Sequence, residues 1–228
     1  MSQDRPAEAA AERHALVGKA ELWEMKRRFQ ITFLREAGLE PHHRVLDIGC
    51  GTLRGGLPVI EHLDVGGYTG VDVRQVAIDE ARAELRDAGL EDKAPDLRVV
   101  DDLGTVDLGG PFDVVWAFSV LIHLGPEELE GCLACVARHL ADDGRAFGNV
   151  NVTGAPIGLT ATVKERLRPR WQGFPVVRHP IAHYRDRAAA HGLVVEDLGP
   201  LAELGHRAGR PVADQQRMLE LTRAPGGS

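Results

Sequence analysis

Charged residues flank a glycine-rich turn near position 50 with the spacing of a small-molecule binding loop. In the stretch VLDIGCGTLRGG, Asp47 precedes a turn that contains Gly49 and Gly51, and Arg54 follows the turn. Glycine has no side chain to block a ligand, and a carboxylate attracts a cationic group. Asp72 lies about 20 residues beyond the glycines, where doubly wound sheets place the acid that accepts hydrogen bonds from ribose hydroxyls. The pattern predicts a ligand with a ribose and a cationic end that is not a phosphate.

The same loop does not match the common phosphate-binding fingerprints. A dinucleotide fingerprint of the G-x-G-x-x-G type would need a third glycine at position 54, where this chain has Arg54. A Walker loop would need Gly-Lys followed by Ser or Thr, which the loop lacks. Both phosphate cradles are therefore disfavoured. A nicotinamide oxidoreductase is disfavoured for the same reason, and because Asp47 stands ahead of the turn.

The elements that must position this loop alternate between strand and helix. Apolar runs predict strands at residues 44–48, 68–73, 97–100, 112–118 and 145–150, and periodic patterns predict helices at 55–62, 75–88 and 127–140. Strands that are separated by helices pair in parallel, which predicts an α/β fold. A less regular stretch then leads to a predicted helix at 183–190 and strands at 193–198 and 217–222. Residues 7–36 are predicted to be helical, because their apolar side chains recur at spacings of about 3.6 residues.

The composition predicts a soluble, single-domain protein of a reducing compartment. The chain has 228 residues, of which 43% are hydrophobic and 27% charged, close to an average globular domain. No apolar run approaches the roughly 20 residues of a membrane span, and the N-terminus lacks the apolar core of a secretory signal. Three cysteines do not make a full disulfide framework. We therefore expect a cytoplasmic protein that does not bind membranes, and the net charge of -7 argues against general nucleic-acid binding.

Four motifs together resemble those of the class I, Rossmann-like S-adenosylmethionine-dependent methyltransferases: DIGCGT, GVDV, VVDDL and FDVVWAFSVLIHL. The resemblance is clear over residues 44–150 and fainter over 193–222. It implies a doubly wound, seven-stranded, mostly parallel α/β sheet with an antiparallel last strand at 217–222. It also implies S-adenosyl-L-methionine as cofactor and S-adenosyl-L-homocysteine as product.

The resemblance divides the single domain into four parts. Residues 1–40 would form an N-terminal helical arm or lid, 41–150 the cofactor-binding core, 151–190 the acceptor-binding segment and 191–228 the closing strands. On the arm, Trp23, Arg27 and Gln30 are candidates for contact with cofactor or acceptor when a lid closes. Core packing is the alternative for this helix.

Carried over residue by residue, the resemblance implies a set of cofactor contacts. The methionine moiety would meet Asp47, Gly49 and Gly51; the ribose would meet Asp72 with Val73 beside it; the adenine would meet Asp101 or Asp102 with Leu103; and the sulfonium side would meet Phe118 and Ser119. The family often has a third glycine two positions after Gly51, where this chain has Leu53. We hypothesise that Arg54 pairs with the methionine carboxylate. A surface arginine at the start of a helix is the alternative.

Catalytic candidates follow the predicted strand at 112–118 and lie in the variable region. His123 could act as a general base or line the acceptor pocket, and a purely structural histidine is the alternative. His183, Tyr184 and His206 are further candidates. Methyl transfer from a sulfonium needs mainly the alignment of nucleophile, methyl group and leaving sulfur, so a base is not required for every acceptor. Cys132, Cys135 and His139 share one face of a predicted helix, but we expect packing there and no metal site.

A basic segment between residues 164 and 187 carries seven positive and two negative side chains, interleaved with Trp171, Phe174 and Tyr184. It predicts an anionic or aromatic acceptor, and a solvated basic surface is the alternative. The function expected from the sequence is methyl transfer to an O or N nucleophile of a small molecule, of natural-product or metabolite type. A non-catalytic S-adenosylmethionine-binding module and an RNA methyltransferase remain alternatives, although nucleic acid is not the expected partner. A homodimer is left open.

Overall fold

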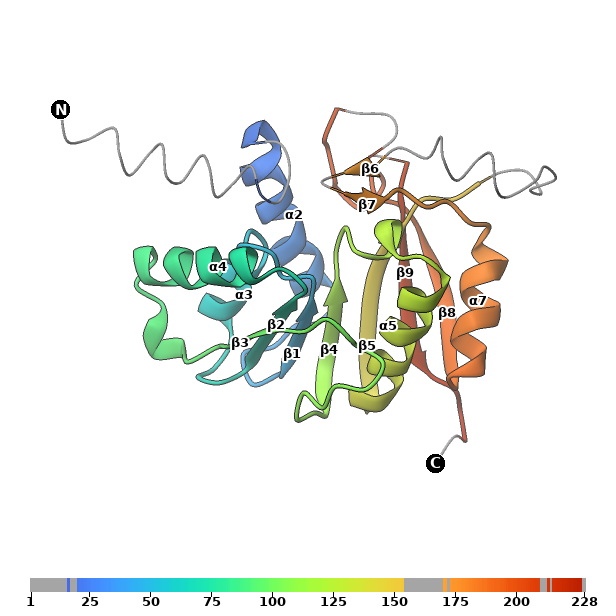
Figure 1. Cartoon of the computed structure of the whole chain (residues 1–228), viewed down its shortest axis with the longest axis horizontal. Coiled ribbons are helices and arrows are strands. Elements are labelled where there is room, and N and C mark those ends of the chain that lie inside the picture. Colours follow the sequence, from blue (N-terminus) through green and yellow to red (C-terminus); the bar gives the residue numbers. More distant parts are fainter. Residues whose placement is uncertain are drawn as a thin grey trace.

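The computed structural model describes residues 16, 20–153, 170–171, 173–209, 213 and 215–226. Seven strands of the described chain form one sheet in the order β3-β2-β1-β4-β5-β9-β8 (Figure 1). Their bounds are Val45–Ile48 (β1), Tyr68–Asp72 (β2), Asp96–Val99 (β3), Phe112–Ala117 (β4), Leu140–Val150 (β5), Leu193–Pro200 (β8) and Arg217–Arg223 (β9). The strands β1 to β5 pair in parallel, whereas β9 is antiparallel to β5 and β8. The predicted seven-stranded, mostly parallel sheet with an antiparallel last strand is confirmed.

Helices cover both faces of the sheet, as crossovers between parallel strands require (Figure 1). On one face lie α2 (Trp23–Glu36), α3 (Gly56–His62) and α4 (Gln75–Asp87), and on the other α5 (Pro126–His139) and α7 (Ile181–Ala190). Two helix ends have local causes. Pro126 occupies the first turn of α5, where its missing N–H would have no helical partner. Gly89 follows α4 with a φ of 66°, the left-handed conformation that commonly ends a helix.

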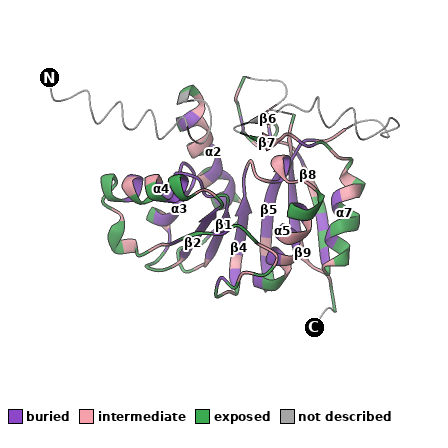
Figure 2. Ribbon diagram, viewed as in Figure 1, coloured by how far each residue is buried: buried purple, intermediate pink, exposed green. Residues whose placement is uncertain are grey.

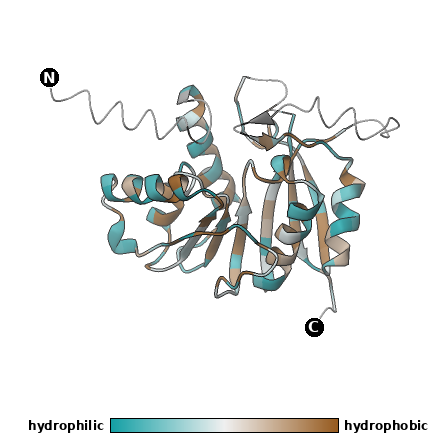
Figure 3. Cartoon of the chain, in the orientation of Figure 1, coloured by the Kyte–Doolittle hydropathy of each residue, from teal (hydrophilic) through white to brown (hydrophobic). Residues whose placement is uncertain are grey.

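Strand β4 shows how the sequence divides its apolar side chains between two cores. Val115 and Ala117 belong to the core beneath α5 and α7, whereas Val114 and Trp116 belong to the core beneath α2, α3 and α4. Successive side chains of a strand point to opposite faces, so a central strand covered on both sides is apolar at nearly every position. Accordingly, the central strands are buried in Figure 2 and largely brown in Figure 3, where the helices carry most of the hydrophilic colour.

Most predicted element boundaries lie within two residues of the structure, and three differences are larger. Strand β5 begins at Leu140, directly after α5, and is longer than the predicted 145–150. The N-terminal helix is described only from a short 3-10 turn (Ala20–Leu22) into α2, and the earlier part of the predicted helix lies outside the described residues apart from Leu16. A two-stranded hairpin, β6 (Arg170–Trp171) and β7 (Phe174–Pro175), was not predicted, because two-residue strands are too short to show a periodic pattern.

The hairpin lies beyond the carboxyl end of β4, between the upper part of α2 and the end of β5 in Figure 1. The backbone N–H of Val177, just after β7, donates to the carbonyl oxygen of Ile122 at 2.9 Å and ties the hairpin to the loop after β4. In the part of the chain that the structure describes, no helix has the length and apolar character that crossing a membrane demands.

Candidate cofactor and acceptor site

The glycine-rich loop follows β1 at the carboxyl edge of the sheet, where parallel strands place binding loops. The backbone N–H groups of Gly49 and Cys50 donate to the carbonyl oxygen of Val71 at 2.7 and 3.0 Å, and so tie the loop to β2. Gly49 and Gly51 have φ angles of 73° and 56°, which glycine adopts without steric cost. A Cβ at Gly49 would also clash with Val120 in the loop after β4. The turn itself therefore requires both glycines.

Leu53, which stands where the family often has a third glycine, keeps a glycine-like backbone. Its φ is 60°, in the left-handed region that costs a residue with a Cβ about 1–2 kcal/mol. Its side chain is fully buried in the core beneath α2, α3 and α4. Burial of a leucine side chain contributes roughly 1.5–3 kcal/mol, which offsets the strain. Leu53 thus adopts the left-handed conformation of the turn while its side chain anchors the loop to the core.

Asp47 is buried beneath the loop, and its pKa is raised to about 7. Burial is the main cause and the charge of Asp72 adds to the rise, while a hydrogen bond from Tyr68 and the charge of Arg54 oppose it. The Tyr68 hydroxyl donates to Oδ2 of Asp47 at 2.6 Å. Tyr68 fits there because Gly56 has no side chain, since a Cβ at Gly56 would clash with the hydroxyl. A cationic ligand group beside Asp47 would favour its charged form.

Arg54 is only 7% exposed, so the alternative of a surface arginine does not hold. Burial lowers the pKa of its guanidinium to about 10, while the charge of Asp47 raises it. The group therefore remains charged at neutral pH. A carboxyl and a guanidinium beneath one loop complement the ammonium and carboxylate of an amino acid. The pairing of Arg54 with the methionine carboxylate stays a prediction that this burial supports.

Helix α2 lies directly against the loop through Gln30. The indole N–H of Trp116 in β4 donates to Oε1 of Gln30 at 2.9 Å. A Cβ at Gly55 would clash with the Gln30 amide, so the glycine permits the approach of α2. Trp23 and Gln30 are buried, which makes this helix part of the core in the structure. Contact of Trp23, Arg27 or Gln30 with a ligand remains a prediction.

Asp72 ends β2 and faces the glycine loop. Its Oδ2 accepts a hydrogen bond from the backbone N–H of Gly51 at 3.1 Å, and its Oδ1 accepts one from the backbone N–H of Arg74 at 2.9 Å. This is the position expected of an acid that binds a ribose. Val73 beside it is 50% exposed, an apolar surface where the resemblance places the cofactor.

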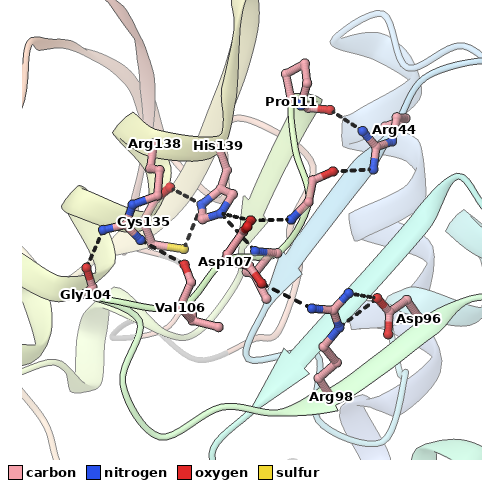
Figure 4. Close-up of polar contacts among 12 residues, drawn as sticks. Arg44, Asp96, Arg98, Gly104, Val106, Asp107, Pro111, Cys135, Arg138 and His139 are labelled. Carbon is pink, nitrogen blue, oxygen red and sulfur yellow. Dashed lines mark hydrogen bonds and ion pairs between the residues drawn. The ribbon is translucent and has the colours of Figure 1, made fainter.

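The loop between β3 and β4, which begins with the residues predicted at adenine, is fixed by basic side chains (Figure 4). Three side chains donate to its backbone carbonyls: Arg44 just before β1, Arg98 of β3 and Arg138 of α5. Asp102 accepts hydrogen bonds from the Thr105 hydroxyl at 2.7 Å and the Gly104 N–H at 2.8 Å, which lower its pKa. Asp101 and Asp102 are exposed, and Leu103 packs against the core beneath α5 and α7. Their contact with adenine remains a prediction.

His139 of α5 supports the same loop, and the two cysteines of that helix pack in the core. His139 Nε2 accepts the backbone N–H of Leu108 at 3.0 Å, and its Nδ1–H donates to the carbonyl oxygen of Cys135 at 2.9 Å (Figure 4). Cys132 and Cys135 are buried in the core beneath α5 and α7, and burial raises the pKa of both thiols. Among the described residues, no group of three His, Cys, Asp or Glu side chains is arranged to hold a metal ion.

Phe118 and Ser119, predicted at the sulfonium, follow β4 at the same edge of the sheet. Ser119 has a φ of 64°, and its N–H donates to Oδ1 of the fully buried Asn149. Asn149 Nδ2 in turn donates to Oε1 of Gln216 at 2.8 Å. The Phe118 ring stacks on Trp116 with centroids 5.5 Å apart. Side-chain amides and an aromatic stack therefore hold this strained turn in place.

His123 joins the loop after β4 to the β6–β7 hairpin. Its Nδ1 lies 2.7 Å from the carbonyl oxygen of Pro175, so Nδ1 carries the hydrogen and Nε2 the lone pair in the neutral ring. Burial lowers the pKa of His123, the bond to Pro175 opposes this, and the charge of Lys26 lowers it further. Lys26 Nζ lies 6.0 Å from the ring centroid of Phe118, and the Phe174 ring lies 6.2 Å from that of His123. His123 thus lies near the ring of Phe174 and the charge of Lys26, and its lowered pKa favours the neutral imidazole.

The other catalytic candidates lie farther from this group. Tyr184 is 3% exposed in the core beneath α5 and α7, on the face of the sheet opposite to Phe118, and burial raises its pKa. The His183 ring stacks on His179 at 4.1 Å, and burial lowers its pKa. Neither Nε2 of His183 nor the Tyr184 hydroxyl has a hydrogen-bond partner among the described residues. His206, in contrast, packs 6.0 Å from the Phe118 ring.

Some residues at the site were not predicted from the sequence. Tyr68, Lys26 and Asn149 carry no local pattern, because each acquires its contact from a different strand or helix. Arg74 lies two positions after Asp72, just beyond β2, and was not singled out from the sequence either.

A doubly wound sheet with an acid-flanked glycine turn and a second acid at the end of β2 defines a nucleoside-binding α/β protein. Residues 46–146 match the model of a methyltransferase domain. The resemblance to the class I S-adenosylmethionine-dependent methyltransferases that the motifs predicted is confirmed over this part of the chain.

Two curated relatives and one solved structure illustrate the similarity. The chain is 31% identical over 152 residues to 27-O-demethylrifamycin SV methyltransferase of Amycolatopsis mediterranei, covering 63% of this chain and 52% of the relative. It is 38% identical over 68 residues to geranyl diphosphate 2-C-methyltransferase of Saccharopolyspora erythraea, covering 28% and 23%. Magnesium protoporphyrin IX methyltransferase from Synechocystis PCC 6803, solved with bound S-adenosylhomocysteine, superposes with a TM-score of 0.62 at 22% identity, covering 89% and 84%. The chain thus spans about half or less of the length of these two curated relatives.

Proposed function

We propose that this chain transfers the methyl group of S-adenosylmethionine to an oxygen or nitrogen atom of a small anionic or aromatic molecule. The observation that carries the proposal is the arrangement of Asp47, Arg54 and Asp72, three buried ionisable side chains around one glycine loop. In their ionised forms they complement the ammonium, the carboxylate and the ribose hydroxyls of that cofactor, so the residues present fit it. When bound, the cofactor supplies a methyl group that is already activated on a sulfonium.

The chain's own part in such a transfer is alignment and, for an acceptor that bears a proton, its removal. His123 is suited to take this proton, because its neutral ring carries the lone pair on Nε2. The bond from Nδ1–H to the carbonyl oxygen of Pro175 would strengthen as the ring becomes charged. We therefore assign His123 as the general base and as the anchor of the hairpin at the same time.

The surroundings of His123 support an acceptor with a negative charge or an aromatic ring. Lys26 supplies positive potential at His123, and the aromatic ring of Phe174 lies beside it. The basic segment at 164–187 lends less support, since three of its seven cations, Lys164, Arg166 and Arg168, lie outside the described residues. One described member, Arg187, pairs with Glu130 of α5 at 3.0 Å. The names of both curated relatives state small-molecule substrates, which also supports a small acceptor.

The test is an acceptor screen that measures S-adenosylhomocysteine release from S-adenosylmethionine by the purified chain. Phenols, aromatic acids, amines and phosphorylated small molecules form the panel, with neutral aliphatic alcohols and RNA as comparison arms. We expect turnover with anionic or aromatic members. Turnover on neutral aliphatics alone contradicts the acceptor class, turnover on RNA alone contradicts the small molecule, and cofactor binding without product on any arm indicates a binding module.

Two variants test the residue roles on an active acceptor. His123→Asn keeps an N–H that can reach the Pro175 carbonyl but has no base, so we expect kcat to fall about 10²-fold or more. An unchanged kcat in this variant refutes the base. Lys26→Met should raise KM for an anionic acceptor and leave KM for a neutral aromatic one unchanged. An equal effect on both acceptors refutes the charge argument.

A further inference from the structure

Arg74 forms an ion pair with Asp72, the acid that the proposed function assigns to the ribose. Its Nε lies 3.1 Å from Oδ1 of Asp72, and its Nη2 lies 3.2 Å from Oδ2. The two contacts form a bidentate guanidinium–carboxylate pair, in which the arginine side chain is 22% exposed and the aspartate side chain 6%. The arginine therefore reaches the acid from the solvent side, the side from which a ligand must also come.

The hydrogen-bond positions of Asp72 are full in this arrangement. Each oxygen accepts one backbone donor, the N–H of Arg74 at Oδ1 and the N–H of Gly51 at Oδ2, and one guanidinium donor of Arg74. An ionised carboxylate offers about four acceptor positions, so a ribose diol finds none vacant. The backbone donors are fixed by the turn and by the end of β2. The guanidinium is the group that can leave.

We propose that Arg74 is an exchangeable occupant of the ribose position and sets the affinity of this chain for its cofactor. The two ribose hydroxyls replace the two guanidinium N–H groups, so that Asp72 accepts four hydrogen bonds before and after the exchange. This inference rests on the proposed function, because it takes Asp72 to be the ribose-binding acid.

The exchange also releases contacts outside the ribose position. Arg74 Nη1 donates to the carbonyl oxygen of Leu16 at 3.0 Å, and its guanidinium carbon lies 5.9 Å from the ring centroid of Phe174 in β7. In the present arrangement Arg74 thus connects the acid of β2 to the β6–β7 hairpin and to the chain ahead of α2. A ligand that displaces the guanidinium gives up these contacts as well, which lowers the net gain from binding.

A second Asp-x-Arg pair shows that saturation of the acid is particular to Asp72. On the neighbouring strand β3, Arg98 pairs with Asp96 at the same sequence spacing. Both side chains of that pair are 42% exposed, and the guanidinium bonds a single carboxylate oxygen, Oδ2. The Asp-x-Arg spacing alone therefore does not fill all the hydrogen-bond acceptor positions of the carboxylate. At Asp72 the buried end of β2 and the Gly51 N–H complete them.

The experiment is isothermal titration of the full chain with S-adenosylhomocysteine. Arg74→Met removes the guanidinium but keeps an unbranched apolar side chain, and we expect its Kd to fall by about tenfold relative to wild type, the effect of releasing one bidentate, partly exposed ion pair. Asp72→Asn should raise Kd, because it removes the charged acceptor. Arg187→Met breaks a surface arginine–carboxylate pair remote from the loop and should leave Kd unchanged.

A second ligand separates exchange from a structural role of Arg74. The 2′,3′-dideoxy analogue of S-adenosylhomocysteine has no hydroxyls to offer Asp72. In wild type the binding energy gained from the two hydroxyls is offset by loss of the Arg74–Asp72 pair, so the ratio of the two Kd values is small. In Arg74→Met we expect this ratio to grow by about tenfold in favour of S-adenosylhomocysteine. A merely structural effect would change both affinities equally.

The outcomes separate this inference from the proposed function. Equal or weaker binding of S-adenosylhomocysteine by Arg74→Met, or an unchanged preference between the two ligands, overturns the exchange while leaving the cofactor assignment intact. Equal binding by wild type and Asp72→Asn also overturns it, since Asp72 is then not the ribose acid. Failure of every variant to bind S-adenosylhomocysteine overturns the proposed function and this inference together.

Discussion

Replacement of Leu53 tests whether the cofactor loop keeps a glycine-like backbone under strain. Leu53→Ala and Leu53→Gly both remove a fully buried side chain from the core beneath α2, α3 and α4. Truncation of a buried leucine to alanine costs about 2–5 kcal/mol of unfolding free energy. Alanine retains the strain of a φ of 60°, whereas glycine relieves it.

The difference in unfolding free energy between Leu53→Ala and Leu53→Gly reports the conformational strain of the backbone at this position. Relief of the strain at the left-handed φ raises the free energy of unfolding of the glycine variant by about 1–2 kcal/mol, whereas the larger backbone entropy of unfolded glycine lowers it by roughly 0.5–1 kcal/mol. We expect Leu53→Gly to be the more stable variant by about 0.5–1 kcal/mol, although both are less stable than wild type. For a chain of this length that difference corresponds to a Tm higher by about 1–4 °C.

Ile60 provides the matched control, since it is 1% exposed in the same core but lies inside α3. Glycine in a helix interior is about 1 kcal/mol less favourable than alanine, so Ile60→Gly should be less stable than Ile60→Ala. The assay is thermal unfolding of the four variants and the wild type by circular dichroism. The same order of stability at both positions, with alanine above glycine, would refute the strain argument.

Three further predictions address buried groups. Burial raises the pKa of Asp47 from 3.8 to about 7, so between about pH 4 and 7 the folded state keeps this proton while the unfolded state releases it. Stability should therefore fall as the pH rises through that range, and Asp47→Asn should flatten the dependence of Tm on pH. Burial raises the pKa of all three thiols, so intact-mass analysis should find Cys50, Cys132 and Cys135 unmodified by iodoacetamide in the folded protein and all three modified in denaturant. Gln30→Ala leaves the buried indole N–H of Trp116 without its acceptor and should lower the free energy of unfolding, measured in urea, by about 1–3 kcal/mol. Gln30→Glu retains an acceptor oxygen, so its free energy of unfolding should differ from that of Gln30→Ala if this hydrogen bond is the cause.

The sequence predicted the parts of the site that depend on local residue type. The glycines of the loop were readable because their φ angles exclude most other residues, and Asp72 was readable because the end of the second strand in such sheets is a fixed position. Leu53 was read only as a departure from the family. Its backbone angle follows from the turn, and the core that makes the angle tolerable is assembled from α2, α3 and α4.

The alternation of apolar strands and amphipathic helices determined the fold class by itself, because the periods of strand and helix are local properties of the chain. The sequence did not determine which side chains meet. Several contacts at the site join residues that are distant in sequence. His139 supports the β3–β4 loop, Gln30 accepts a hydrogen bond from Trp116, and His123 contacts the β6–β7 hairpin. The burial of Arg54 likewise depends on the folded chain around it. Such contacts carry no periodic signal, since they are fixed by strand order and by the packing of two cores. Only the tertiary structure decides them.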